Sequence, residues 1–214
     1  MVDEEIGFIE EEWNCGLLAL LDAFSLSGLN IDYDTLRENY FNLGFELYSF
    51  GITSVHLALL AKEFDFDVTL KTSSKWLKGI YEYANNRIRT RVRLSYESST
   101  TLKAMKMFIK LGGKIYFTTR AKKGNISDVN FSIRKGNINI LCVNANQYYG
   151  IDEEWNHYIV VKKNDNPKYD FAVVDSLRNI GELWYDDWDK YLKKAERYDW
   201  QLWCGDLIEL TKNN

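Results

Sequence analysis

The sequence predicts an α+β protein in which a helical lobe packs against an antiparallel β-sheet. Two observations support this class. The first half of the 214-residue chain places apolar side chains at helical spacing, whereas the second half contains short β-branched and aromatic runs separated by turn residues. Helices followed by strands are typical of α+β proteins. The 46% hydrophobic content is sufficient for one substantial core.

The expected helices share apolar residues that recur every three or four positions. Asp34 is expected to cap the second helix, and Gly112-Gly113 to end the fifth. The five predicted helices span Cys15 to Leu26, Asp34 to Leu43, Ser54 to Phe64, Ser74 to Asn86 and Ser99 to Leu111.

The expected strands are rich in β-branched and aromatic residues. Three are predicted to lie next to one another as antiparallel neighbours, at Ile138 to Val143, His157 to Lys162 and Tyr169 to Val174. A helix at about Asp186 to Arg197 and a strand at Gln201 to Leu210 are expected to complete the fold.

The chain is expected to form a single domain over residues 1–214, because neither a repeat nor a linker interrupts it. A balance of 27 basic and 31 acidic side chains gives a formal charge of −4, which does not favour nucleic acid or an anionic membrane as a partner. Neither a basic-then-apolar leader nor 18 consecutive apolar residues occurs. Three scattered cysteines indicate reduced thiols, so we expect a cytoplasmic protein.

Cys15 is the strongest candidate for a reactive residue. It lies at the start of an apolar helical run and is followed directly by Gly16. Unpaired N–H groups and the helix macrodipole favour negative charge at this position. The sequence therefore predicts a stabilised thiolate, which is the nucleophilic form of cysteine.

His157 and Asp175 are the candidate partners of this thiol. His157 opens one predicted strand, and Asp175 directly follows the next. If the two strands form a hairpin, the start of the first lies beside the end of the second. The carboxylate can then orient the imidazole and favour a thiolate–imidazolium pair with Cys15.

Several short motifs in this chain resemble papain-like cysteine peptidases of the bacteriocin-processing, double-glycine-leader family. They are Glu11-Glu12-Trp13-Asn14-Cys15-Gly16-Leu17, Gly51-Ile52-Thr53-Ser54, Asn156-His157-Tyr158-Ile159-Val160-Val161 and Val173-Val174-Asp175-Ser176. The resemblance implies a papain-like fold with a nucleophile helix on the sheet. It also implies that Cys15 is the nucleophile, His157 the base and Asp175 the residue that orients the base.

The chain departs from this family pattern in two places. Such peptidases usually carry a glutamine six residues before the nucleophile to complete the oxyanion hole, and this position is Ile9 here. Asn14 is the nearest neutral amide and a weak oxyanion candidate. The 142 positions between Cys15 and His157 also predict an insertion at about residues 75–130. This insertion is expected to extend the core, or else to cover the cleft or bind a partner.

The resulting hypothesis is a hydrolase that cleaves a peptide or amide bond through an acyl-enzyme, using Cys15, His157 and Asp175. Its substrate is expected to be a peptide or protein, and neither cofactor nor metal is expected. Two alternatives stay open: acyl or peptidyl transfer through the same thioester, and a papain-like binding domain that has lost activity.

The remaining candidate residues favour structural roles. Cys142 alternates with apolar neighbours, Cys204 lies in an aromatic strand pattern and His56 lies in an apolar helical run, so all three are expected to pack. An arginine stripe is the one hint of nucleic-acid binding, but an exposed edge strand is the preferred interpretation. This stripe comprises Arg87, Arg89, Arg91 and Arg93.

Overall fold

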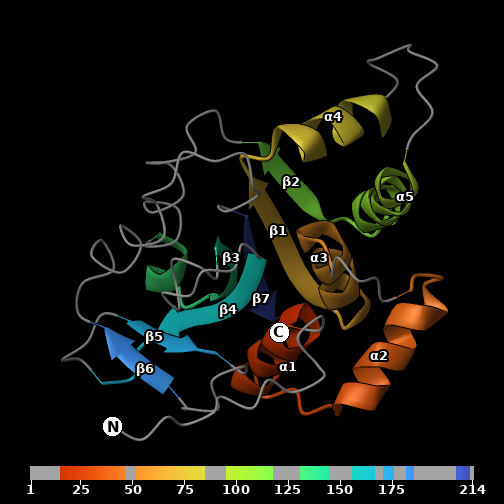
Figure 1. Ribbon diagram of the computed structural model, residues 1–214. Helices are drawn as coiled ribbons and strands as arrows, with labels where there is room; N and C mark the ends of the chain where they lie inside the picture. Colours follow the sequence, from red (N-terminus) through yellow and green to blue (C-terminus); the bar gives the residue numbers. More distant parts are fainter. Residues whose placement is uncertain are drawn as a thin grey trace, which may run out of the picture.

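The structure is a computed structural model, and its described residues form several stretches of the chain. They are 15–46, 52–84, 95–117, 131–144, 156–166, 171–175, 182–185 and 206–212. Within these residues, the chain forms one sheet with its longer helices on one side (Figure 1). The predicted α+β class is therefore confirmed.

The sheet contains seven strands in the order β2-β1-β7-β3-β4-β5-β6. Neighbouring strands are antiparallel except for β1 and β2, which are parallel. The strands are β1 (Phe66–Thr72), β2 (Lys114–Phe117), β3 (Ile138–Asn144), β4 (Asn156–Lys163), β5 (Phe171–Val174), β6 (Glu182–Tyr185) and β7 (Leu207–Lys212).

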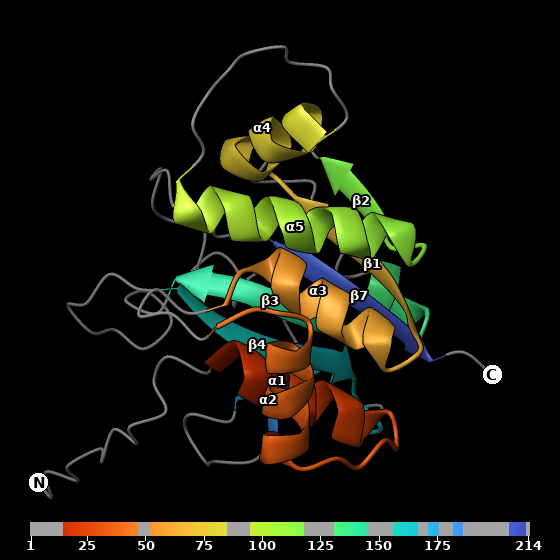
Figure 2. The same ribbon diagram turned by 90° about the vertical axis from the view of Figure 1, so that its right-hand side faces the viewer.

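The helices α1, α3 and α5 lie side by side across one face of the sheet (Figure 2). α1 packs on β3 and β4, α3 packs on β1 and β7, and α5 packs on α3 and β2. The helices are α1 (Cys15–Leu26), α2 (Tyr33–Asn42), α3 (Ser54–Glu63), α4 (Lys75–Ala84) and α5 (Tyr96–Lys110).

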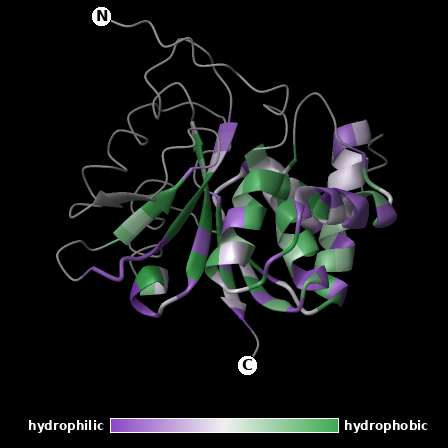
Figure 3. Ribbon diagram, turned by 90° about the horizontal axis from the view of Figure 1, so that it is seen from below, coloured by the Kyte–Doolittle hydropathy of each residue, from purple (hydrophilic) through white to green (hydrophobic). Residues whose placement is uncertain are grey.

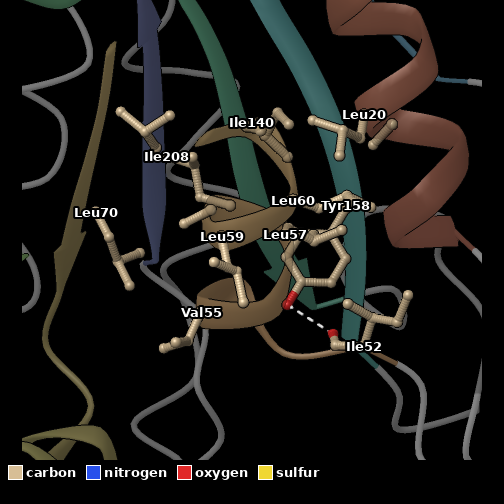
Figure 4. Packing of buried hydrophobic residues seen from close by; sticks show 14 of the residues in the cluster. Leu20, Ile52, Val55, Leu57, Leu59, Leu60, Leu70, Ile140, Tyr158 and Ile208 are labelled. Atoms are coloured by element: carbon tan, nitrogen blue, oxygen red, sulfur yellow. Dashed lines mark hydrogen bonds between the residues drawn. The ribbon is translucent and has the colours of Figure 1, made fainter. Parts of the chain in front are cut away.

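The main core lies between these helices and the sheet, where apolar segments face one another (Figure 3). Successive strand residues point to opposite faces, so every second residue of each central strand enters this core. Figure 4 shows Leu57 and Leu60 of α3 beside Ile140, Tyr158 and Ile208 of the sheet. The buried sheet residues on this side include Val68, Leu70, Ile140, Cys142, Tyr158, Val160, Ile208 and Leu210.

The five predicted helices are all present, with small shifts at their ends. α1 has the predicted bounds, which confirms that Cys15 is its first residue. The expected cap of α2 is wrong, because Asp32 rather than Asp34 accepts a hydrogen bond from Thr35 N at 2.7 Å. Asp32 has the extended backbone of an N-cap residue, whereas Asp34 lies in the first helical turn.

α5 begins at Tyr96, three residues before the predicted start at Ser99. Ser95 caps the helix by accepting a hydrogen bond from Ser98 N at 3.2 Å. Its predicted end is confirmed. Gly112 has a φ of +82°, and Gly113 N donates to Phe108 O at 2.9 Å. A glycine favours this left-handed conformation because it has no Cβ.

The predicted antiparallel arrangement of β3, β4 and β5 is confirmed. The division into early helices and late strands is wrong, because β1 lies between α3 and α4. The burial of β1 alternates along the strand, which is the period-2 signal of a strand. The sheet is also not wholly antiparallel, because β1 and β2 run in the same direction.

The described parts of the 75–130 segment add to both the sheet and the core. β2 extends the sheet beyond β1, and α5 buries Ala104, Met105 and Phe108. The predicted helix at 186–197 and the first part of the last predicted strand, 201–205, lie outside the described residues. None of the described helices is long and apolar enough to cross a membrane.

Two glycine-to-alanine substitutions provide a matched test of this packing. A Cβ at Gly113 would overlap the buried Phe108 ring, whereas a Cβ at Gly79 in α4 meets nothing within 4 Å. We expect Gly113→Ala to lower the free energy of unfolding by about 1–3 kcal/mol. Gly79→Ala should raise it by about 0.5–1 kcal/mol through helix propensity. Urea unfolding followed by circular dichroism measures both changes, and equal effects would contradict the packing described here.

Candidate functional site

Cys15 is the first residue of α1, the helix that packs on β4. Its side chain is buried, with 8% of the residue exposed. Gly16 allows α1 to approach α3 closely, because a Cβ at this position would lie 3.1 Å from Leu57 Cδ1. Helix packing therefore fixes the position of the thiol.

Burial raises the pKa of the Cys15 thiol to about 11. The N–H groups of Tyr158 and Gly16 lower this pKa, and the negative charge of Asp175 raises it, but each effect is smaller than desolvation. The prediction that the helix start stabilises a thiolate is therefore wrong for this conformation. The main-chain N–H groups act in the expected direction, but they do not compensate for the lost solvation of the anion.

His157 and Asp175 come together through the hairpin of β4 and β5. Val160 pairs with Val174, so Asp175 lies opposite Ile159, and His157 is its diagonal neighbour on the same face. His157 Nε2 lies 2.9 Å from Asp175 Oδ1, and both side chains are 1% exposed. The predicted proximity of these two residues is therefore present in the structure.

Cys15 approaches the same strand through the main chain. Its Sγ lies 4.0 Å from the carbonyl oxygen of Asn156, the residue directly before His157. This contact, at the outer limit for a thiol hydrogen bond, is with the backbone of β4 and not with the imidazole. The structure thus joins His157 to Asp175 and brings Cys15 to the adjoining residue.

Two of the residues expected to pack do so. His56 is 3% exposed, and its ring lies edge-on to Phe45 with 4.7 Å between centroids. Its Nδ1 lies 2.7 Å from Thr53 Oγ1, and burial lowers the pKa of His56 to about 4. Cys142 is 5% exposed in β3.

The other sequence-predicted candidates lie outside the described residues. They are Ile9 and Asn14, which precede Cys15 in the sequence, Cys204, and the arginine stripe of Arg87, Arg89, Arg91 and Arg93. Within the described part of the chain, His, Cys, Asp and Glu side chains form no group of three or more that could hold a metal ion.

Sequence reasoning missed a buried polar cluster on the helix-facing side of β4. Asp206, at the start of β7, contacts the hydroxyls of Ser54 and Thr72, and Ser54 in turn contacts the hydroxyl of Tyr158. Asp206 is separated from Ser54 by 152 positions, so local spacing gives no signal of this contact. The one available signal is an acidic residue directly before the apolar pair Leu207-Ile208.

Comparison with known proteins gives limited similarity. No protein-family model and no curated protein matches the chain. Among solved structures, it is similar to the peptidase domain of Streptococcus ComA, described as a bi-functional ABC transporter involved in a quorum sensing pathway. The two chains share 14% sequence identity at a TM-score of 0.45, and the match covers 94% of this chain and 92% of that chain.

The raised pKa of Cys15 predicts how its alkylation depends on pH. Because only the thiolate reacts, the rate with iodoacetamide should rise about tenfold per pH unit from pH 7 to 10. A chain carrying Cys142→Ala and Cys204→Ala leaves Cys15 as its one thiol, and intact-mass spectrometry follows the adduct. A small free thiol measured in parallel should react faster at pH 7. A rate that is already constant between pH 6 and 8 would instead reveal a preformed thiolate.

Proposed function

We propose that this chain is a thiol hydrolase of papain-like architecture that cleaves a peptide or amide bond in a peptide or protein substrate. The observation that carries the proposal is the buried His157–Asp175 pair, with its 2.9 Å contact, at the start of the strand whose first carbonyl contacts Cys15. A cysteine at a helix start, a histidine and an orienting carboxylate are the groups that thiol acyl transfer requires.

In this proposal Asp175 sets the tautomer of His157. The carboxylate accepts a hydrogen bond from Nε2–H, so Nδ1 of the neutral ring is the proton acceptor. Nδ1 takes the proton of the Cys15 thiol as Sγ attacks the substrate carbonyl carbon. The resulting imidazolium lies next to a carboxylate that stabilises it.

The acyl-enzyme then forms and breaks down in two balanced steps. The carbon–nitrogen bond of the tetrahedral intermediate breaks, and His157 returns its proton to the leaving amine. A water molecule next attacks the thioester, giving one proton to His157. The carbon–sulfur bond breaks, and the thiol of Cys15 is restored by that proton.

The raised pKa of Cys15 determines when its proton moves. A thiol with a pKa of about 11 is neutral at pH 7, so attack and proton transfer to His157 must be coupled. A bound substrate that displaces the weak contact between Cys15 Sγ and the Asn156 carbonyl oxygen would free the thiol for this step.

The oxyanion needs hydrogen-bond donors at the start of α1. The main-chain N–H of Cys15 is one candidate, because the first N–H groups of a helix have no partner within the helix. We propose the Asn14 amide as the second, in place of the glutamine that Ile9 replaces. Loss of one such donor typically costs about 10²–10³ in rate.

One observation favours a second candidate, a papain-like binding domain without activity. The Cys15 side chain is buried, and its pKa is raised instead of lowered, which is the behaviour of a structural cysteine. The two candidates make opposite predictions for reaction with an acylating substrate analogue.

We expect a peptide p-nitrophenyl ester to acylate Cys15, which is detected as a thioester by acid quench and peptide mapping. His157→Ala should lower the acylation rate by about 10²–10⁴, because the proton acceptor is lost. Asp175→Asn should lower it by up to about 10⁴, because the amide favours the wrong tautomer. Cys15→Ala should abolish the thioester.

His56 provides a matched control, because the chain contains two histidines and this one lies in α3 with its ring against Phe45. His56→Gln should keep the acylation rate within about threefold, since it touches no reacting group. Circular dichroism should show that each variant is folded. Acylation that occurs equally in wild type and His157→Ala, or an adduct confined to Cys142 or Cys204, would contradict the hydrolase and favour the binding domain.

A further inference from the structure

A buried chain of hydroxyl groups links Asp206 to the strand that carries His157. Ser54 Oγ lies 2.7 Å from Asp206 Oδ2 and 3.2 Å from Tyr158 Oη. Tyr158 Oη lies 3.1 Å from Ile52 O (Figure 4). Thr72 Oγ1 contacts the other carboxyl oxygen, Oδ1.

These groups come from four separate elements of the fold. Ser54 begins α3, Thr72 ends β1, Tyr158 is the third residue of β4, and Asp206 directly precedes β7. Asp206 is 2% exposed and Tyr158 is 7% exposed. Loss of one of these contacts would therefore leave a buried polar group without water to replace it, which is costly.

The number of hydrogens indicates the protonation state of Asp206. Four contacts connect the chain: Thr72 to Asp206, Asp206 to Ser54, Ser54 to Tyr158, and Tyr158 to Ile52 O. The three hydroxyl groups supply three hydrogens. An ionised carboxylate supplies none, so one of the four contacts would place two oxygen atoms together without a hydrogen.

A proton on Asp206 Oδ2 satisfies every contact. Thr72 accepts from Ser74 N at 2.9 Å and donates to Oδ1. Oδ2–H then donates to Ser54, Ser54 donates to Tyr158, and Tyr158 donates to Ile52 O. Each hydroxyl is used once as a donor, and all four contacts become hydrogen bonds.

We propose that Asp206 carries a proton in this fold in weakly acidic solution and acts, through Ser54 and Tyr158, as a positioning residue for His157. This inference rests on the proposed function for the role of His157, but the assignment of the proton does not. The chain of hydrogen bonds links the start of β4 to the start of α3 through Tyr158, the residue that follows His157.

The position of His157 depends on its two neighbours along β4. Asn156 contacts Cys15 Sγ through its carbonyl oxygen, and Tyr158 is held by Ser54 and the carbonyl oxygen of Ile52. Movement of β4 relative to α3 would therefore alter the approach of the imidazole to the thiol. A misplacement of about 1 Å can cost about 10²-fold in rate.

The surroundings of Asp206 are consistent with a neutral acid. Burial raises the pKa of Asp206 to about 6, although the hydroxyls of Thr72 and Ser54 lower it. Tyr158 faces it from β4; burial raises the pKa of Tyr158, and Cys142 of β3 and Cys15 of α1 raise that pKa further. Within the described residues, none of the groups that shift the pKa of Asp206 is a cation.

The raised pKa sets the sign of the pH dependence. Asp206 binds its proton more tightly in the folded chain than in the unfolded chain, where its pKa is near the ordinary value of 3.8. Its contribution to stability is therefore fully present below pH 3.8 and is lost as the pH rises through about 6.

The proton is tested by ¹³C NMR of the intact chain with labelled aspartate carboxyl groups. Asp206→Asn identifies the resonance, which should titrate with a midpoint near pH 6. Asp32 is the internal control, because its hydrogen bonds to Thr35 lower its pKa below the ordinary value. An Asp206 midpoint at or below that of an exposed aspartate would overturn the proposal, whatever the reactivity of Cys15.

The positioning role is tested with variants that keep or break the chain of donors. Asn retains one acceptor for Thr72 and one donor for Ser54, so Asp206→Asn should keep the acylation rate within about threefold at about pH 5, where Asp206 of the wild type is protonated. It should also remove the loss of stability between pH 4 and 6 that we expect of the wild type in urea unfolding. Asp206→Ala and Tyr158→Phe should slow acylation about tenfold or more, because the start of β4 is no longer held.

Tyr116→Phe is the matched control for the tyrosine variant, because Tyr116 is 54% exposed on β2. It should leave the acylation rate unchanged. If Asp206 titrates near pH 6 but Tyr158→Phe and Asp206→Ala acylate like the wild type, the positioning role is wrong. A wild-type chain that is never acylated, with Asp206 titrating near pH 6, contradicts the proposed function and supports the assigned proton.

Discussion

The antiparallel pairing of β4 with its neighbours is the constraint on which the site depends. Because side chains alternate along a strand, His157 and Tyr158 point to opposite faces of the sheet. One face brings His157 to Asp175, which directly follows β5, and the other brings Tyr158 to the start of α3. A shift of one residue in register would exchange these two side chains and remove both sets of contacts.

Close helix packing places Cys15 against this strand, and it also makes the thiolate costly. Gly16 lets α1 approach Leu57 of α3, and the same packing removes the Cys15 thiol from water. Desolvation then outweighs the main-chain N–H groups that favour the anion. A thiol held in this way avoids oxidation and nonspecific alkylation at neutral pH, since both reactions need the thiolate. In the proposed reaction, the proton therefore moves only when His157 and a substrate carbonyl are in place.

Local patterns in the sequence predicted the elements, but not all of their contacts. Apolar spacing predicted both bounds of α1, and the β4–β5 hairpin placed His157 beside Asp175 because both depend on neighbouring stretches of chain. β1 was missed because it lies between two helices, and β2 because it is short and its parallel pairing with β1 joins segments separated by more than 40 positions. The pKa of Cys15 was misjudged for a related reason. The helix start is visible in the sequence, whereas burial by β4 is a tertiary effect.

Asp175 and Asp206 show how such tertiary surroundings give one residue type two roles. Both are buried near the ends of strands, with 3% and 2% of the residue exposed. Asp175 faces an imidazole that can carry a positive charge, and its own negative charge raises the pKa of Cys15. Among the described residues, the Asp206 carboxyl group contacts hydroxyl groups, which provide too few hydrogens for an ionised carboxylate. A carboxylate is suited to orienting a histidine, and a neutral acid to donating a hydrogen bond, so the partners of each aspartate determine its chemistry.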